Sequence, residues 1–76
     1  MMQVIFHKRK TLDKHIRELE CEIRQAKDDI MLAEQFFNYA EKEYIDVAIY
    51  QLEAANKRYS VLIKEMKDLL KRWNKK

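Results

Sequence analysis

Apolar residues recur along most of this chain at alternating steps of four and three positions. An average step of 3.5 residues is typical of helices that bury one narrow stripe against a partner helix. The pattern therefore predicts two long helices, at about residues 11–38 and 42–74. The first stripe comprises Leu12, Ile16, Leu19, Ile23, Ala26, Ile30, Ala33 and Phe37, and the second comprises Ile45, Ala48, Leu52, Ala55, Tyr59, Leu62, Met66, Leu69 and Trp73.

The two stripes are out of phase, because Phe37 and Ile45 are eight residues apart and not seven. One extra residue rotates a helix face by about 100°, so a single straight helix would place Gln51 and Arg58 in its stripe. A reversal of the chain at residues 38–43 avoids this. It pairs stripe residues whose numbers add up to 81 or 82, and it sets alanine opposite alanine: Phe37–Ile45, Ala33–Ala48, Ile30–Leu52, Ala26–Ala55, Ile23–Tyr59, Leu19–Leu62, Ile16–Met66 and Leu12–Leu69.

The predicted fold is thus an all-α, coiled-coil-like antiparallel hairpin. We expect a basic N-terminal tail at residues 1–10 and the hairpin at residues 11–76, with Thr11 capping the first helix. Asn38 is expected to end that helix in the left-handed conformation. The alanine layers would let the two helices approach closely near the turn.

The stripes do not account for every large apolar residue in the two helices. A chain of 76 residues buries only about 60% of its unfolded surface, so its stability alone is marginal. A second copy that completes a four-helix bundle, or another protein, would supply the missing burial. The additional apolar residues are Met31, Leu32 and Phe36 in the first helix and Ile49, Ile63 and Leu70 in the second.

The composition agrees with long helices and few turns. The chain has no glycine and no proline, which tight β-hairpins usually need. No apolar run approaches the roughly 20 residues of a membrane span, and the apolar start precedes the basic residues, the reverse of a signal peptide. The single cysteine, Cys21, agrees with a reducing cytoplasm.

Charge is unevenly distributed along the chain. Residues 1–17 carry five basic and one acidic side chain, residues 64–76 carry six and two, and residues 18–63 carry five and ten. In the hairpin both termini meet, so a basic open end opposes an acidic body. This end is a candidate site for phosphate of nucleic acid, and less so for an anionic membrane surface. Its candidate residues are Lys8, Arg9, Lys10, Lys71, Arg72 and Trp73.

Residues that carry out catalysis are not evident. His15, Glu18 and Glu22 share one helix face, but the order of the metal-binding Glu-x-x-His motif of bundles is reversed. Cys21 lies between two glutamates, which oppose its activation. We therefore expect no enzymatic activity, no cofactor and no metal. The leading hypothesis is a non-catalytic protein-interaction module, in which the second helix binds through Asp46, Ile49, Tyr50, Glu53 and Ile63.

The stretch IDVAIYQLEAANKRYSVLIKEMK, residues 45–67, resembles the YaaL-like family of small bacterial proteins of unknown function. Phe37 and Asn38 look like the pair that often precedes the turn of that family, whereas Glu41-Lys42 replaces its usual Asp-Pro. The resemblance implies a cytoplasmic protein with no established activity, whose genes often lie near those for recombination and replication. The matching residues are Ile45, Asp46, Ala48, Ile49, Tyr50, Leu52, Glu53, Ala54, Ala55, Lys57, Arg58 and Tyr59.

Overall fold

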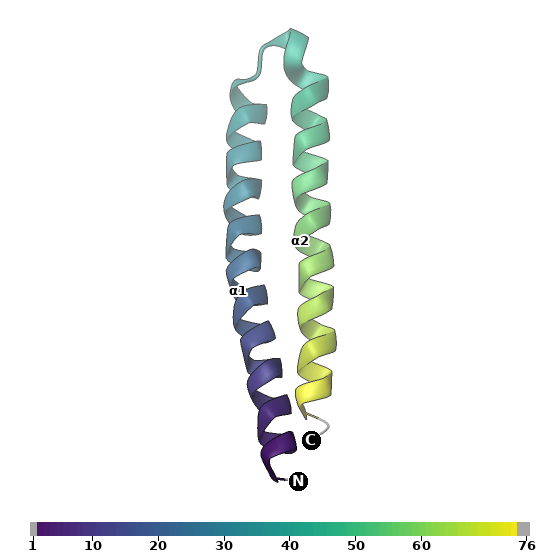
Figure 1. The fold of residues 1–76 in the computed structure, drawn as a ribbon. Helices are drawn as coiled ribbons and strands as arrows, with labels where there is room; N and C mark the ends of the chain where they lie inside the picture. The colour runs from purple at the N-terminus through teal and green to yellow at the C-terminus, as the bar shows by residue number, and fades with distance from the viewer. Residues whose placement is uncertain (1, 75–76) are drawn as a thin grey trace.

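Two long helices lie side by side and run in opposite directions (Figure 1). The computed structural model describes the backbone of residues 2–74 and the side chains of residues 12–73. Helix α1 spans Met2–Tyr39, a short 3-10 helix η1 spans Lys42–Tyr44, and α2 spans Ile45–Asn74. The molecule is a rod with extents of 62 × 16 × 12 Å. The predicted antiparallel helical hairpin is therefore confirmed.

The first helix is longer than the stripe alone predicted. It begins at Met2, so the expected start at residue 11 is corrected, and the segment 2–10 continues α1 where a tail was expected. Thr11 consequently lies inside the helix and does not cap it. The physical reason is local, because neither glycine nor proline interrupts this segment, and its Met, Gln, Lys and Arg residues all favour helix.

The turn is tighter than predicted and uses no left-handed residue. Asn38 lies within α1, and no residue of the described backbone has a positive φ angle. The chain instead reverses at Glu41, which is extended with φ −72° and ψ 160°. The Tyr44 amide donates a hydrogen bond to the Glu41 carbonyl at 2.8 Å. This 3-10 turn occupies residues that were assigned to the second helix, so α2 starts at Ile45 and not at residue 42.

The core follows the two predicted stripes closely. Among the described side chains, all five buried apolar residues belong to them: Leu19, Ala26, Ala33, Ala48 and Leu62. The other stripe positions are half-buried, except Phe37 and Trp73 at the ends, which are 36% and 37% exposed. Away from the stripes, Ile63 is also half-buried. The burial pattern thus supports the predicted register of the hairpin.

Alanine sets the spacing between the helices near the turn. Ala26 and Ala48 have 0% exposure. A side chain this short is fully covered only where the opposing helix lies close to it, toward the lower end of the usual 8–10 Å separation. Further along, Leu19 and Leu62 fill the seam with larger side chains, against which Ile23, Tyr59, Met66 and Leu69 pack.

A two-helix rod leaves much of its surface in water. The accessible surface is 6802 Å², whereas a compact monomer of 9.4 kDa is expected to have about 5,000 Å². Among the described residues, no large side chain is fully buried. The hairpin therefore has apolar surface available for a further contact.

We expect Ala48→Leu to destabilise the hairpin by roughly 1–3 kcal/mol, because extra methyl groups force apart two helices that touch at this level. Thermal unfolding followed by circular dichroism measures the change. Ser60→Leu is the control, because Ser60 is an exposed small residue of the same helix. Equal melting temperatures for the two variants would contradict the close approach at Ala48.

Candidate protein-interaction surface

The two helices together form two broad side faces of the rod. Because each residue turns a helix by about 100°, positions just before a stripe residue point to one side and positions just after it point to the other. Asp29 precedes the stripe residue Ile30, and Arg58 precedes Tyr59. Their side chains meet at 2.7 Å, from Nη1 of Arg58 to Oδ2 of Asp29. The preceding positions of both helices therefore share one side, which we call the Arg58 face.

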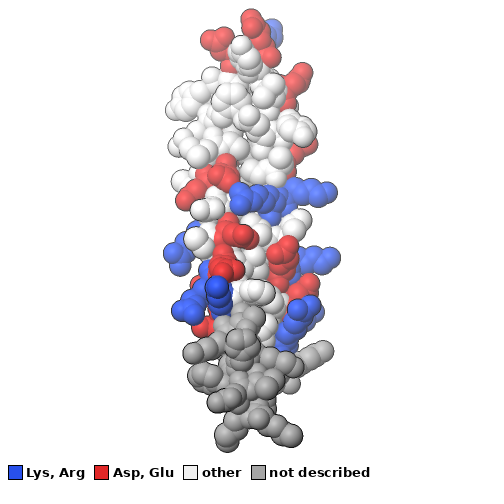
Figure 2. All heavy atoms as spheres, viewed as in Figure 1, with Lys and Arg blue, Asp and Glu red and all other residues white. Residues whose placement is uncertain are grey.

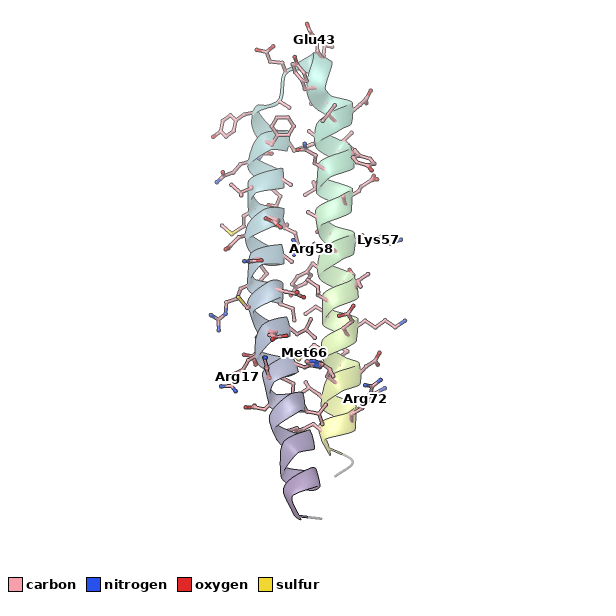
Figure 3. The ribbon with its side chains drawn as sticks, viewed as in Figure 1. Arg17, Glu43, Lys57, Arg58, Met66 and Arg72 are labelled. Carbon is pink, nitrogen blue, oxygen red and sulfur yellow. The ribbon has the colours of Figure 1, made fainter. Side chains whose placement is uncertain are left out.

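Figure 3 places the side chain of Arg58 between the two helices, whereas Lys57 points away from α1. The opposite side of the rod contains Ile49, which follows Ala48, and we call it the Ile49 face. Met31 follows Ile30 and lies on the Ile49 face, whereas its neighbour Leu32 precedes Ala33 and lies on the Arg58 face. Adjacent residues of α1 thus belong to opposite surfaces.

Four large apolar side chains gather on the Arg58 face between the ion pair and the turn. We call them the turn-proximal patch: Leu32, Phe36, Tyr44 and Val47, which are 62%, 41%, 53% and 47% exposed. Gln51 and Ala54, also uncharged and exposed, continue the patch along α2. In Figure 2 this part of the visible face is almost entirely white. With about 200 Å² for each large side chain, the patch exposes roughly 400 Å².

Charged groups delimit the turn-proximal patch at both ends. The tip of the rod carries Glu41 and Glu43 on either side of Lys42, and the Asp29–Arg58 pair lies at the opposite boundary. Neither residues 28–41 nor residues 43–56 contain a lysine or an arginine. On the visible face, charged side chains at the tip are followed by a white, uncharged region and then by acidic and basic side chains together (Figure 2).

The residues predicted for partner binding lie elsewhere. Asp46, Ile49 and Glu53 all follow stripe positions, so they lie together on the Ile49 face, where Ile49 is 40% exposed. Tyr50 is 73% exposed, and as the second residue after Ala48 it lies on the side of α2 remote from the seam. Ile63 is on the Ile49 face but is half-buried and lies about 21 Å from Ile49 along the helix. The structure thus forms a mixed acidic and apolar edge from three of the five residues.

Tyr44 and Val47 were absent from the predicted surface. They precede Ile45 and Ala48 just as Leu32 and Phe36 precede Ala33 and Phe37, and this parallel is visible in the sequence. In an antiparallel pair whose stripes face each other, the positions that precede both stripes lie on the same side of the rod. The Asp29–Arg58 contact agrees with this geometry.

The open end carries the predicted phosphate-binding residues only in part. Lys71 and Arg72 are exposed, and Trp73 is 37% exposed. The side chains of Lys8, Arg9 and Lys10 lie outside the described residues. Both ends of the chain lie at this end of the rod (Figure 1). Residues 30–56, the turn half, carry five acidic side chains and one basic one, a net charge of −4. Because the whole chain has a net charge of +3, the residues outside this range carry a net charge of +7.

Near the open end, the Arg58 face is slightly hollowed. An open depression of about 300 Å³ is lined by His15, Glu65, Asp68, Leu69 and Arg72. His15 therefore lies beside carboxylates of α2 as well as near Glu18 and Glu22 of its own helix. Among the described side chains, no group of three or more His, Cys, Asp and Glu residues is placed to hold a metal ion.

Comparison of the chain with protein-family models, with curated proteins and with solved structures gave no match. The resemblance of residues 45–67 to the YaaL-like family therefore stays an expectation. None of the helices, over its described residues, is long and apolar enough to cross a membrane.

We expect a double-mutant cycle of Asp29→Asn and Arg58→Gln to give a coupling of about 0.2–1 kcal/mol, because both side chains are about half exposed. The coupling should decrease as salt is added to the unfolding experiments. The Asp13–Arg17 pair, at 3.1 Å within α1, is the control for a contact that does not join the helices. Zero coupling between Asp29 and Arg58 would contradict a stabilising contact between the two helices at this point.

Proposed function

We propose that this protein is a non-catalytic helical module that associates with a protein surface through the turn-proximal patch. The observation that carries the proposal is the uncharged, apolar surface made by Leu32, Phe36, Tyr44 and Val47, in a chain of which 38% of the residues are charged. Contiguous apolar patches of a few hundred Å² on small proteins often mark interaction sites.

The shape of the rod supports a binding role over a catalytic one. Enzymatic sites generally need a concave pocket in which several groups converge. The depression beside His15 is open and shallow, and it lies on a rod only 12–16 Å across. Two rigid helices instead present long, flat side faces, which suit packing against other helices.

We expect Leu32→Lys to reduce association strongly, whereas Met31→Lys should leave it almost unchanged. Leu32 and Met31 are neighbours in α1 and are 62% and 61% exposed, but they lie on opposite faces. Burying a lysine ammonium in an apolar contact is unfavourable, so only the variant on the binding face should suffer. Sedimentation of the purified chain and co-purification of partner proteins from the source cells are measured together.

Ile49→Lys in the same measurements tests the surface predicted from the sequence, because Ile49 lies on the opposite face with Asp46 and Glu53. Loss of association for Ile49→Lys, with Leu32→Lys unaffected, would transfer the function to the Ile49 face. Absence of any association for the unmodified chain would contradict the proposed function itself.

The charge separation favours a second candidate function, nucleic-acid binding at the open end. Both ends of the chain meet there, and residues outside 30–56 carry net +7. Lysines and arginines that contact phosphates release bound counterions, which gives sequence-independent affinity. Trp73, which is 37% exposed, would stack on a base in such a complex.

If about four phosphates are contacted, we expect affinity for DNA or RNA to fall about 100-fold between 50 mM and 200 mM salt. Joint replacement of Lys8, Arg9, Lys71 and Arg72 by glutamine should abolish binding in a fluorescence-anisotropy titration. The control replaces Lys27, Lys42, Lys57 and Arg24, which removes equal charge elsewhere on the rod. Equal losses for the two variants would show only a general charge effect.

A further inference from the structure

We propose that the turn-proximal patch is covered by a second copy of this chain, which lies antiparallel and overlaps only the turn half of the rod. This inference rests on the proposed function and specifies its partner. It differs from a bundle in which two hairpins overlap along their whole length. Each acidic tip would lie at one end of the overlap, and the two basic open ends would project in opposite directions.

The spacing of charged and apolar groups is self-complementary in this arrangement. Tyr44 and Arg58 are 14 residues apart in α2, about 21 Å along the helix, and Gln51 lies midway. Phe36 lies at the same level in α1, because 36 and 51 have the same sum as the contacting pair 29 and 58. A two-fold axis at this level would place patch on patch and Tyr44 of one copy against Arg58 of the other.

The charges at the boundaries of the patch favour this antiparallel orientation. The tip of one copy, with Glu41 and Glu43, would reach the first cations of the other, Lys57 and Arg58. The Arg58 guanidinium is about half exposed and would also lie against the Tyr44 ring, a favourable cation–aromatic contact. A parallel dimer would instead bring both acidic tips together.

Carboxylates on the same face limit the overlap to the turn half. Below Arg58, the positions that precede the stripes include four carboxylates, Glu18 and Glu22 in α1 and Glu65 and Asp68 in α2. The others among the described side chains are His15, Gln25, Val61 and Arg72. A full-length antiparallel dimer would place Glu22 and Glu18 opposite Leu32 and Phe36 of the partner. Burying carboxylates without cationic partners is strongly unfavourable. In the shorter overlap, Glu65 lies about 10 Å beyond the tip of the partner and stays in water.

The size of the patch sets an expectation for stability. Roughly 400 Å² of exposed apolar surface is about half of the 800 Å² that each partner contributes to a standard interface. Polar contacts of Gln51 at the two-fold axis and of the ion pair at the boundary would supply the remainder. We therefore expect a dimer that dissociates on dilution.

Distances between spin labels on the full chain test this arrangement directly. Lys42 at the tip and Lys71 at the open end are replaced by cysteine, one at a time, after Cys21→Ser removes the exposed native thiol. With a rise of 1.5 Å per residue, we expect about 25 Å between the two labels at position 42 and about 60 Å between those at position 71. Double electron–electron resonance covers both values.

Each other arrangement gives a different pair of distances. A full-length antiparallel bundle gives about 50 Å at position 42 and about 35 Å at position 71, and a parallel dimer gives less than about 25 Å at both. Either result would overturn the proposed overlap but leave an interaction module. Sedimentation as a 9.4 kDa monomer at every concentration would also overturn it. Partner capture abolished by Leu32→Lys would then still support the proposed function.

Matched variants separate the contributions of packing and charge. Leu32→Lys should raise the dimer dissociation constant at least tenfold, whereas Met31→Lys on the opposite face should leave it within twofold. Joint replacement of Glu41 and Glu43 by lysine should weaken the dimer at low salt, and the difference should shrink as salt screens the tip. Circular dichroism checks that each variant keeps its helices, so that loss of dimer is not loss of fold.

Discussion

Ala26 and Ala48 are completely covered although alanine is a short side chain, so α1 and α2 must lie close together at these levels. The rest of the structure depends on this contact. It allows a hairpin without glycine or proline to form a continuous seam, in which larger side chains such as Leu19 and Leu62 fill the space further from the turn. It also makes the rod thin, with two side faces that the seam cannot cover.

The side faces differ because the residues beside the stripes change character along the rod. On the Arg58 face, apolar side chains near the turn give way to an ion pair and then to a mixed region, in which carboxylates of both helices lie beside Val61, His15 and Arg72. On the Ile49 face, Met31 and Ile49 alternate with acidic residues such as Asp46 and Glu53. A polar face remains well solvated, whereas the turn-proximal patch remains exposed until another surface covers it. The residues beside the stripes thus make the two faces of the hairpin different, although both faces are formed by the same two helices.

The candidate surface was only half predictable from the sequence. Leu32 and Phe36 were recognised as surplus apolar residues, but Tyr44 and Val47 were not associated with them. The predictions were also wrong at two helix ends, where the backbone conformation does not follow from the apolar period. Segment 2–10 lacks an apolar stripe but contains good helix formers, so periodicity missed a helix that local propensity extends. At the turn, extended Glu41 and a 3-10 turn replaced the expected left-handed Asn38.

The order of apolar and polar residues alone determined the helical class, the antiparallel reversal and the identity of the seam, because a 3.5-residue period and its phase slip are properties of the chain itself. Only the tertiary structure decided where the helices end, how the chain turns at Glu41, and how far the side chains beside the seam stay exposed. These properties depend on the backbone of the turn and on the distance between the packed helices, which a hydrophobic period does not specify. They leave Leu32, Phe36, Tyr44 and Val47 exposed on the face that the Asp29–Arg58 contact marks.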